Sequence, residues 1–595
     1  MNNTLFITVV FCFCLTSAYA EVTNQTSQKS LIVNTNPEVK IVAHAVVNFT
    51  NLAKKEAAEK KSTNTAIKHR VIPIGEWHKQ QIPPEDLEKL NNEKQINEGS
   101  SEKKSPTSSQ QTSFSSSSSS PSADDEIKPG ITPVPLGPVT SQDDFQALPQ
   151  NVVNGYLNIP PDTMGVAGKN HLMTVLNSEV RIQQKDGTVI STVSLSNFWA
   201  AVVGSAGGGN AGAFDPKIIY DYANDKYIFV TLDDRDANNG ILIAVSQSDD
   251  PTAGWYQWKI DADSDNNEWA DFPSPGYNTN WIAISVNMFQ IGGAGSFTGA
   301  RIFLLDKKRA YTNDPVIVSV FSFASGNGFT IAPCVTFGNQ TNIYTIDSGW
   351  YAGNDDYVRV GVINGPVNSP TWNFLNYYNI PDTYTTTAAP QLNGGTTNLI
   401  DGGDSRIGSP PIYRFNNVYF TYSGQLSNSV RDVIVWGELN IPGLSIVNTG
   451  IVQETTTPMF YSFPSIAVNS QTSIVIGFAG FSTGIYGSAY YTGREFTNAP
   501  NVMQEVKLLK AGEDYYYQTF GGTRNRWGDY SATCVDPADD LKFWTIQEYA
   551  MPEFNASYDR WGTWWGHIYF VPEPVSISYL SFIICYLLMN RGKYT

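Results

Sequence analysis

The sequence contains little cysteine, little histidine and little charge. Five of its 595 residues are cysteine, five are histidine, and 16% are charged. Cys12 and Cys14 fall in an N-terminal apolar run and Cys585 in a C-terminal one, so Cys334 and Cys534 are the two that belong to the body of the chain. A small scaffold stabilised by many disulfides is therefore excluded.

Histidine is just as scarce beyond residue 145, where only His171 and His567 occur. Two histidines cannot build a histidine-rich zinc site. A Ser-His-Asp triad could use only one of these two histidines, and no Gly-x-x-x-x-Gly-Lys-Ser/Thr motif occurs anywhere. The sequence therefore gives no support to serine-hydrolase or nucleotide-hydrolase chemistry.

Basic residues are too few for a nucleic-acid partner. The 38 Lys and Arg against 55 Asp and Glu leave a formal charge of −17, which would repel phosphates rather than neutralise them. What the chain does have is 31 Tyr, 30 Phe, 14 Trp, 48 Gly and 33 Pro. This balance favours β-strands joined by turns over long helices.

The two ends of the chain predict export. An apolar run over Leu5–Thr16 ends in Ala18-Tyr19-Ala20, the small-x-small pattern of a signal-peptide cleavage site, so residues 1–20 are predicted to be a signal peptide. Residues 571–595 hold a Pro-Glu-Pro, a 15-residue apolar run and two basic residues. That tail resembles the PEP-type C-terminal sorting signals of bacterial envelope proteins. A buried last strand and a weak membrane anchor are the alternatives.

Residues 21–145 have the composition of a spacer. Lysine pairs, a serine run over Ser115–Ser120 and a proline-rich stretch over Pro129–Pro138 leave too little apolar surface to offset the entropy of ordering the chain. We predict a disordered Ser-, Lys- and Pro-rich spacer. A glycosylated or partner-binding tail is the alternative.

A repeat dominates residues 146–570. A short polar start, an alternating strand, a turn and a second apolar strand recur seven times, beginning near residues 162, 215, 271, 332, 406, 463 and 529. The spacing of 53 to 74 residues fits four short strands per copy. The expected fold is all-β, a seven-bladed β-propeller closed by pairing Trp561–Phe570 with a strand near Val152–Leu157. A pair of packed β-sheets is the rival fold.

In a propeller the inner strands of all blades begin beside one central axis, so the residues at their starts converge. Those residues are Asp162, Asp215, Asp271, Thr330 or Ile331, Arg406, Ser462 and Asp529. Four carboxylates around one axis repel unless a cation or an arginine offsets them. We predict a funnel that binds a divalent cation, or a polyol or sugar, through Asp271, Asp529, Arg406 and Arg526. The alternative is that the aspartates only form turns.

A second acidic cluster comprises Asp261, Asp263, Asp265 and Glu268. Alternating oxygen ligands of this kind favour Ca²⁺, although the cluster lacks the glycine and the spaced glutamate of an EF-hand. We predict that the loop can bind calcium, the one cofactor that the sequence suggests. A solvated loop is the alternative.

Two strings of residues resemble a known group of proteins. Pro160-Pro-Asp-Thr-Met-Gly165 and Arg526-Trp-Gly-Asp-Tyr-Ser531 resemble secreted bacterial β-propeller proteins with a sialidase-like fold, and Ser248–Trp255 is similar to the Asp-box turn of sialidases. The resemblance implies a propeller and an exported location, and it supplies no reaction. Sialidases hold their substrate with three arginines, whereas Arg406 and Arg526 are the two candidates here.

We therefore expect a monomeric, exported, envelope-associated propeller that binds glycan or surface-protein ligands without catalysis. The alternative is a carbohydrate-active enzyme, a sialidase-like glycoside hydrolase or lyase, with Asp162, Asp215, Asp271 or Asp529 as its catalytic carboxylates. A structural surface-layer component with no site is the third option.

Overall fold

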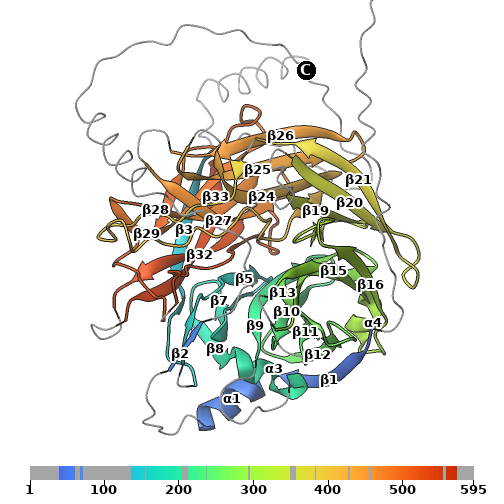
Figure 1. Cartoon of the computed structure of the whole chain (residues 1–595). Helices are drawn as coiled ribbons and strands as arrows, with labels where there is room; N and C mark the ends of the chain where they lie inside the picture. The colour runs from blue at the N-terminus through green and yellow to red at the C-terminus, as the bar shows by residue number, and fades with distance from the viewer. Residues whose placement is uncertain are drawn as a thin grey trace, which may run out of the picture.

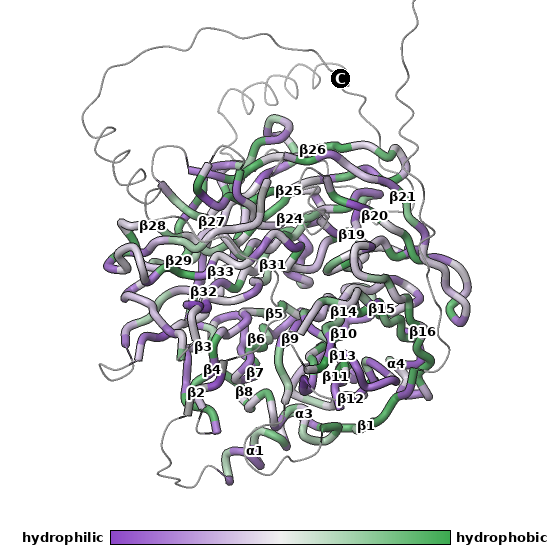
Figure 2. Tube along the Cα trace, in the orientation of Figure 1, coloured by the Kyte–Doolittle hydropathy of each residue, from purple (hydrophilic) through white to green (hydrophobic). Residues whose placement is uncertain are grey.

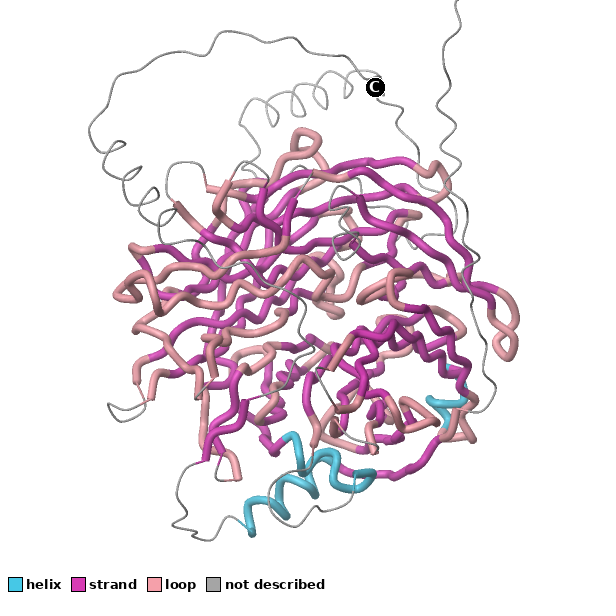
Figure 3. The backbone as a smooth tube through the Cα atoms, viewed as in Figure 1, coloured by secondary structure: helices cyan, strands magenta, loops and turns pink. Residues whose placement is uncertain are grey.

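The computed structural model describes residues 39–59, 68–71 and 136–572, with gaps at 155, 204–211, 236–237, 293–294, 349–356, 382, 427–428, 455–457, 521 and 554–557. The predicted signal peptide and the C-terminal tail beyond Pro572 lie outside these residues. Strands make up most of the described chain, and the few helices lie at its edge (Figure 3). None of the helices in these ranges has the length and apolar character that crossing a membrane requires.

Five sheets of four or five antiparallel strands form separate blades. The first holds β5 (Met164–Ala167), β6 (His171–Val175), β7 (Glu179–Gln184) and β8 (Val189–Ser194). The second holds β9 (Phe214–Asp221), β10 (Lys226–Asp233), β11 (Gly240–Ser246), β12 (Gly254–Asp261) and β1 (Ile41–Asn48). The third holds β17 (Ala332–Pro333), β19 (Ile343–Ser348), β20 (Tyr357–Asn364) and β21 (Thr371–Asn379).

The other two blades come from the C-terminal third of the chain (Figure 1). One holds β27 (Phe460–Val468), β28 (Ile474–Ser482), β29 (Ile485–Arg494) and β30 (Lys507–Lys510). The other holds β31 (Ala532–Val535), β32 (Phe543–Met551), β33 (Arg560–Pro572) and β3 (Leu136–Pro149). A short parallel pair joins β2 (Lys68–Val71) to β4 (Tyr156–Ile159).

The remaining strands belong to one ten-stranded sheet, so the described chain has five separate blades and not the expected seven. This sheet holds β13 (Glu268–Tyr277), β14 (Trp281–Gln290), β15 (Phe297–Asp306), β16 (Val318–Ala324), β18 (Val335–Thr336), β22 (Thr383–Tyr384), β23 (Ile412–Arg414), β24 (Asn417–Leu426), β25 (Asp432–Asn440) and β26 (Ser445–Val452). The physical reason is β18, which pairs in parallel with β13 on one side and with β23 on the other. It thereby merges two four-stranded runs by backbone hydrogen bonds.

The all-β propeller fold itself is confirmed. The first strand of one run contacts the first strand of the next, from β5 to β9 to β13 to β17 and from β23 to β27 to β31, and β31 contacts β5. Residues of β5, β9, β18, β23, β27 and β31 line one axial cavity. Its walls are mainly apolar, with Met164, Ile218, Ile412 and Ile466 among them. The rival pair of packed sheets would have no such axis.

The ring closes at a different strand from the one that we expected. Trp561–Phe570 does lie in the closing strand β33, but its partner is β3 and not the segment 152–157. β3 places Val139, Ala147 and Leu148 in the core, whereas 156–159 is taken up by pairing with β2. Because β3 lies before the first repeat in the sequence, a strand from the N-terminal side of the repeats completes the C-terminal sheet.

Part of the predicted spacer is ordered, so that prediction is wrong for residues 39–59, 68–71 and 136–145. β1 adds a fifth strand to β12, and the helix α1 (Phe49–Glu59) follows it (Figure 1). Glu56 is 4% exposed and accepts hydrogen bonds from the Ser194 N–H and from Asn197 Nδ2, at the start of helix α3 (Leu195–Val203). These long-range pairings outweigh the polar composition of the segment.

Hydrophobic residues are distributed over the strands of all the sheets (Figure 2). β9 and β14 are buried along nearly their whole length, because each sheet packs on both faces. Fully buried tryptophans, among them Trp199, Trp436 and Trp565, fill the spaces between sheets. The short helix α4 (Lys307–Thr312) follows β15 and is capped by the Asp306 carboxylate.

Candidate functional site

The starts of five inner strands share an unusual backbone conformation. The residues with left-handed φ there are Asp162 (51°), Asp215 (54°), Phe272 (54°), Thr330 (53°) and Phe463 (58°). This region is costly for a residue with a Cβ, and most of all for bulky or β-branched side chains. The strain therefore gathers around the axis, at the positions where the sequence predicts convergence. We call this region the hub.

Side chains from the preceding repeat hold these residues in place. Each accepts the backbone N–H of a strained residue: Asn177 Oδ1 from Asp215 (2.9 Å), Asp215 Oδ2 from Phe272 (3.2 Å), Asn287 Oδ1 from Thr330 (2.7 Å) and Ser423 Oγ from Phe463 (3.1 Å). Each of these hydrogen bonds satisfies a buried backbone N–H group that has no partner in the β-sheet. One repeat thus fixes the start of the next.

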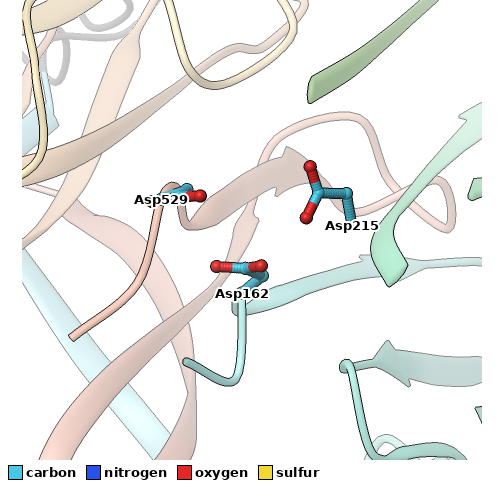
Figure 4. Close-up of side chains that lie close together, drawn as sticks. All are labelled: Asp162, Asp215 and Asp529. Atoms are coloured by element: carbon cyan, nitrogen blue, oxygen red, sulfur yellow. The ribbon is translucent and has the colours of Figure 1, made fainter. Parts of the chain in front are cut away.

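Three of the four predicted carboxylates meet at the hub. Asp162, Asp215 and Asp529 each place an oxygen within 4.8 Å of the others, and Figure 4 shows the carboxylates turned toward one another. Asp162 is 0% exposed, Asp215 is 1% exposed and the Asp529 side chain is 5% exposed. Asp271 is also buried and lies beside them, since its charge acts on Asp215.

Each of the three carboxylates has one oxygen engaged by the protein. Asn177 Nδ2 donates to Asp162 Oδ2 (2.6 Å), the Phe272 N–H donates to Asp215 Oδ2, and Arg526 Nη2 donates to Asp529 Oδ1 (2.8 Å). Asp162 Oδ1, Asp215 Oδ1 and Asp529 Oδ2 have no hydrogen-bond donor among the described residues. The inner side of the cluster is therefore unsatisfied when the carboxylates are ionised.

Burial and mutual repulsion disfavour full ionisation of the cluster. Burial, together with the charge of Asp529, raises the pKa of Asp162 to about 7, although Arg526 and Asn177 oppose the shift. Burial, followed by the charges of Asp271, Asp162 and Asp529, raises the pKa of Asp215 well above its ordinary value. Near neutral pH these two groups compete for protons.

Three cations lie against the carboxylates. The Arg406 guanidinium bonds to Asp404 Oδ1 through Nε (2.8 Å) and lies 4.2 Å from the Phe272 ring centroid. Lys217 Nζ lies between the rings of Phe272 (4.1 Å) and Tyr530 (4.2 Å). Burial lowers the pKa of Lys217 to about 7. With Arg526, these groups offset part of the negative charge, as the sequence predicts for the two arginines.

Residues 401–409 cover the hub. The Ser405 carbonyl accepts from Ser348 Oγ (2.8 Å), and the Gly408 carbonyl accepts from Lys217 Nζ (2.6 Å). Arg406 and Arg526, at 4% and 3% exposure, are as deeply buried as the aspartates. The open funnel that we expected is wrong in this respect: the hub is closed, because this segment packs its Arg406 side chain between Phe272 and Phe329.

The second acidic cluster is held by its own loop. Asp263 Oδ2 accepts the N–H groups of Asn267 (2.8 Å) and Glu268 (3.0 Å), and Arg301 Nη2 binds both Asp263 (3.1 Å) and Glu268 (2.6 Å). Asp261 accepts the Asp263 N–H, and Asp265 is exposed. These carboxylates contact backbone and arginine and do not point to one centre, so calcium binding here stays a prediction.

Lys217, Asp404 and Glu548 are charged residues of the hub that the sequence did not predict. Lys217 lies within β9, which is otherwise almost entirely apolar or aromatic after its start. Glu548 lies within the apolar strand β32 and is 4% exposed, and burial together with the charge of Asp162 raises its pKa well above the ordinary value. A charged residue inside an otherwise apolar strand was the available signal, because burying its charge requires a partner.

Comparisons with known proteins support no family assignment. No protein-family model and no curated protein matches the chain. Among solved structures, a Trypanosoma rangeli sialidase in complex with sialic acid has a TM-score of 0.33 and 11% identity over 66% of this chain and 57% of its own. The α-L-arabinofuranosidase of Fusarium graminearum in complex with an iminosugar inhibitor has a TM-score of 0.34 and 8% identity over 58% and 91%.

A GH43 endo-arabinanase from Bacillus licheniformis has a TM-score of 0.24 and 18% identity, covering 47% of this chain and 93% of its own. The chain spans little more than half the length of the sialidase. TM-scores this low carry no argument about activity, and the propeller assignment depends on the sheet arrangement described above.

Because the pKa of Asp162 is raised, we expect the folded chain to become less stable as the pH rises. The protein is first treated with a chelator, so that bound metal ions do not affect the measurement. The pKa of Asp162 is higher in the folded state than in the unfolded state, so the folded state binds the proton more tightly. The stability that this proton contributes is lost as the pH rises from about 4 to about 7. The shift corresponds to on the order of 4 kcal/mol. Urea unfolding at pH 5 and pH 8 measures the difference.

The double variant Asp162→Asn/Asp215→Asn is the matched control, because the amides do not titrate. Its stability difference between pH 5 and pH 8 should be smaller by a few kcal/mol. An unchanged difference would show that these carboxyl groups are not the source.

Proposed function

We propose that this chain is an exported, envelope-associated binding module that recognises glycans through its outer surface and does not turn them over. The observation that carries the proposal is an exposed aromatic edge on β21. Phe374 is 39% exposed and Tyr377 is 52% exposed, with their ring centroids 4.7 Å apart. Tyr357 of β20 adds a third ring, 4.9 Å from Tyr377.

Aromatic groups of this kind favour ligand binding. Tyrosine and phenylalanine offer flat apolar faces at low entropic cost, and exposed clusters of them mark interaction sites. β21 is the outermost strand of its sheet. A sugar chain could therefore lie along it, with its apolar ring faces on the aromatic side chains and its hydroxyls in water. A surface protein is the alternative ligand.

The closed hub supports binding over catalysis. A polymeric substrate must reach its catalytic carboxylates, and those at the hub are at most 5% exposed beneath residues 401–409. The location outside the cell is supported by the signal-peptide pattern of residues 1–20.

We also propose that the ring has seven units. In the ten-stranded sheet, β13–β16 and β23–β26 are each four consecutive antiparallel strands. The parallel link through β18 involves one residue pair on the β13 side and two on the β23 side. Because this link is so short, we infer that the ten-stranded sheet consists of two blades joined at their inner edges.

One experiment separates binding from catalysis. Purified protein is applied to a glycan array, and each bound glycan is then incubated with excess protein and its products are analysed. We expect binding without products, and a Phe374→Ala/Tyr377→Ala variant should bind about tenfold more weakly or worse. Tyr517→Ala, which removes another exposed tyrosine outside β21, is the matched control and should bind normally.

Enzyme activity is the second candidate, because a protonated carboxyl group beside an ionised one is the arrangement that glycosidases use. Asp162, whose pKa burial raises to about 7, lies beside the Asp529 carboxyl group. Product formation that Asp271→Asn abolishes while the fold is retained would establish the enzyme and overturn the binding module.

A further inference from the structure

The distances at the hub suit a metal ion. One oxygen from each of Asp162, Asp215 and Asp529 lies within 4.8 Å of the other two. Calcium binds oxygen at about 2.3–2.6 Å, so two ligands of one ion lie at most about 5 Å apart. The three residues come from three repeats, far apart in the sequence, and meet only because the ring closes.

The unsatisfied oxygens point to a missing positive partner. Asp162 and Asp215 are at least nine-tenths buried, and each has Oδ1 without a hydrogen-bond donor among the described residues. Glu548 Oε1, which is buried beside Asp162, also has no hydrogen-bond donor among the described residues. Buried acceptors in folded proteins are almost always paired with a donor, water or ion. The hydrogen bonds to Oδ2 of Asp162 and Asp215 orient these carboxylates so that each Oδ1 faces the centre of the cluster.

Charge at the hub is not balanced by the protein. The acidic groups are Asp162, Asp215, Asp271, Asp404, Asp529 and Glu548, and the basic groups are Lys217, Arg406 and Arg526. Arg406 is paired with Asp404 and Arg526 with Asp529. When all nine groups are ionised, three basic charges against six acidic ones leave an excess of negative charge, which a divalent cation would reduce more than a monovalent one.

We propose that Asp162, Asp215 and Asp529 bind a divalent cation, Ca²⁺, at the hub of the propeller. The ligands are carboxylate oxygens without histidine or thiolate, which selects a hard cation over zinc. Ca²⁺ tolerates irregular geometry and completes its shell with water, whereas Mg²⁺ demands a near-ideal octahedron. The ion would join the first, second and last repeats and so hold the ring closed.

This site is independent of the proposed glycan binding, because β21 contributes no residue to it. It also differs from the loop with Asp261, Asp263, Asp265 and Glu268, where calcium was expected from the sequence. The cation here has a structural role, in which it stabilises the ring and takes no part in recognition.

The test uses the full secreted chain, first treated with EDTA and then titrated with Ca²⁺ or Mg²⁺. We expect one Ca²⁺ per chain by calorimetry, a thermal midpoint raised by several degrees, and a weaker response to Mg²⁺. Asp215→Asn should lower the Ca²⁺ affinity at least about 100-fold while it remains folded in EDTA, because the amide also relieves repulsion. Its glycan binding should be unchanged.

Asp263→Asn is the matched control, since it removes one carboxylate from the other acidic cluster. It should keep both the stoichiometry and the thermal shift. Absence of stoichiometric Ca²⁺ binding by the unaltered chain would overturn the proposal. So would a thermal shift that survives Asp215→Asn and disappears in Asp263→Asn, because that result assigns the ion to the loop.

Discussion

Replacing Arg526 by methionine is expected to destabilise the folded chain by about 3–5 kcal/mol. Arg526 is 3% exposed, and its Nη2 donates to Asp529 Oδ1 at 2.8 Å. Its charge also acts on Asp162 and Asp215, and these acidic groups together raise the pKa of the guanidinium although burial opposes the shift. Methionine fills a similar volume but leaves the buried carboxylates without this cation, and that uncompensated charge is the cost.

Chemical denaturation at pH 7.5 in the absence of divalent cations measures the loss. Arg524→Met is the matched control: Arg524 binds Asp401 at 2.6 Å, and the two side chains are 22% and 10% exposed against 4% and 5% for Arg526 and Asp529, so solvent screens the Asp401 charge better. We expect a cost of about 1 kcal/mol or less for the control. Equal costs for the two variants would refute a special electrostatic role for the hub.

Replacing Trp565 by alanine is expected to cost about 3–5 kcal/mol. Trp565 lies in the closing strand β33, is 0% exposed, and packs edge-on against Trp544 with ring centroids 6.2 Å apart. Its Nε1 donates to Thr174 Oγ1 (2.9 Å) in β6, which belongs to the first blade. A Cβ at Gly165 would lie 2.7 Å from Trp565 Cζ2, so this glycine makes room for the ring.

The variant therefore removes contacts between the first blade and β33 of the last sheet, which are far apart in the sequence and are held together by packing and hydrogen bonds. Trp564→Ala is its control: that side chain lies on the other face of β33, where it bonds to Asp144 (3.0 Å) and lies under Lys510 (4.5 Å). We expect the control to lose less than half as much stability in urea unfolding. A larger loss from Trp564→Ala would contradict the assignment of Trp565 to the closing contact.

The part of the fold that could be predicted depends on residues that are close together in the sequence. Turn residues and alternating strands recur in each copy, so the sequence predicts four-stranded units and places their inner starts at Asp162, Asp215 and Asp271 within a few residues. It could not predict β18 or β3 as partners, because strand pairing depends on which segments the ring brings together. The fifth copy also begins later than Arg406, at Ile412, since 401–409 is used to cover the hub.

The candidate site also has residues that the sequence predicted and residues that only the structure revealed. Asp162, Asp215 and Asp529 follow from the repeat, since equivalent positions around an axis must converge, and Arg406 and Arg526 follow from the need to offset their charge. Lys217 and Glu548 belong to the hub only because their strands pass beside it. The chain alone thus specified an all-β repeat with acidic strand starts, which depend on neighbours in sequence. Tertiary packing decided that the hub is closed, unbalanced in charge and separate from the exposed aromatics of β21, because burial and electrostatics depend on residues hundreds of positions apart.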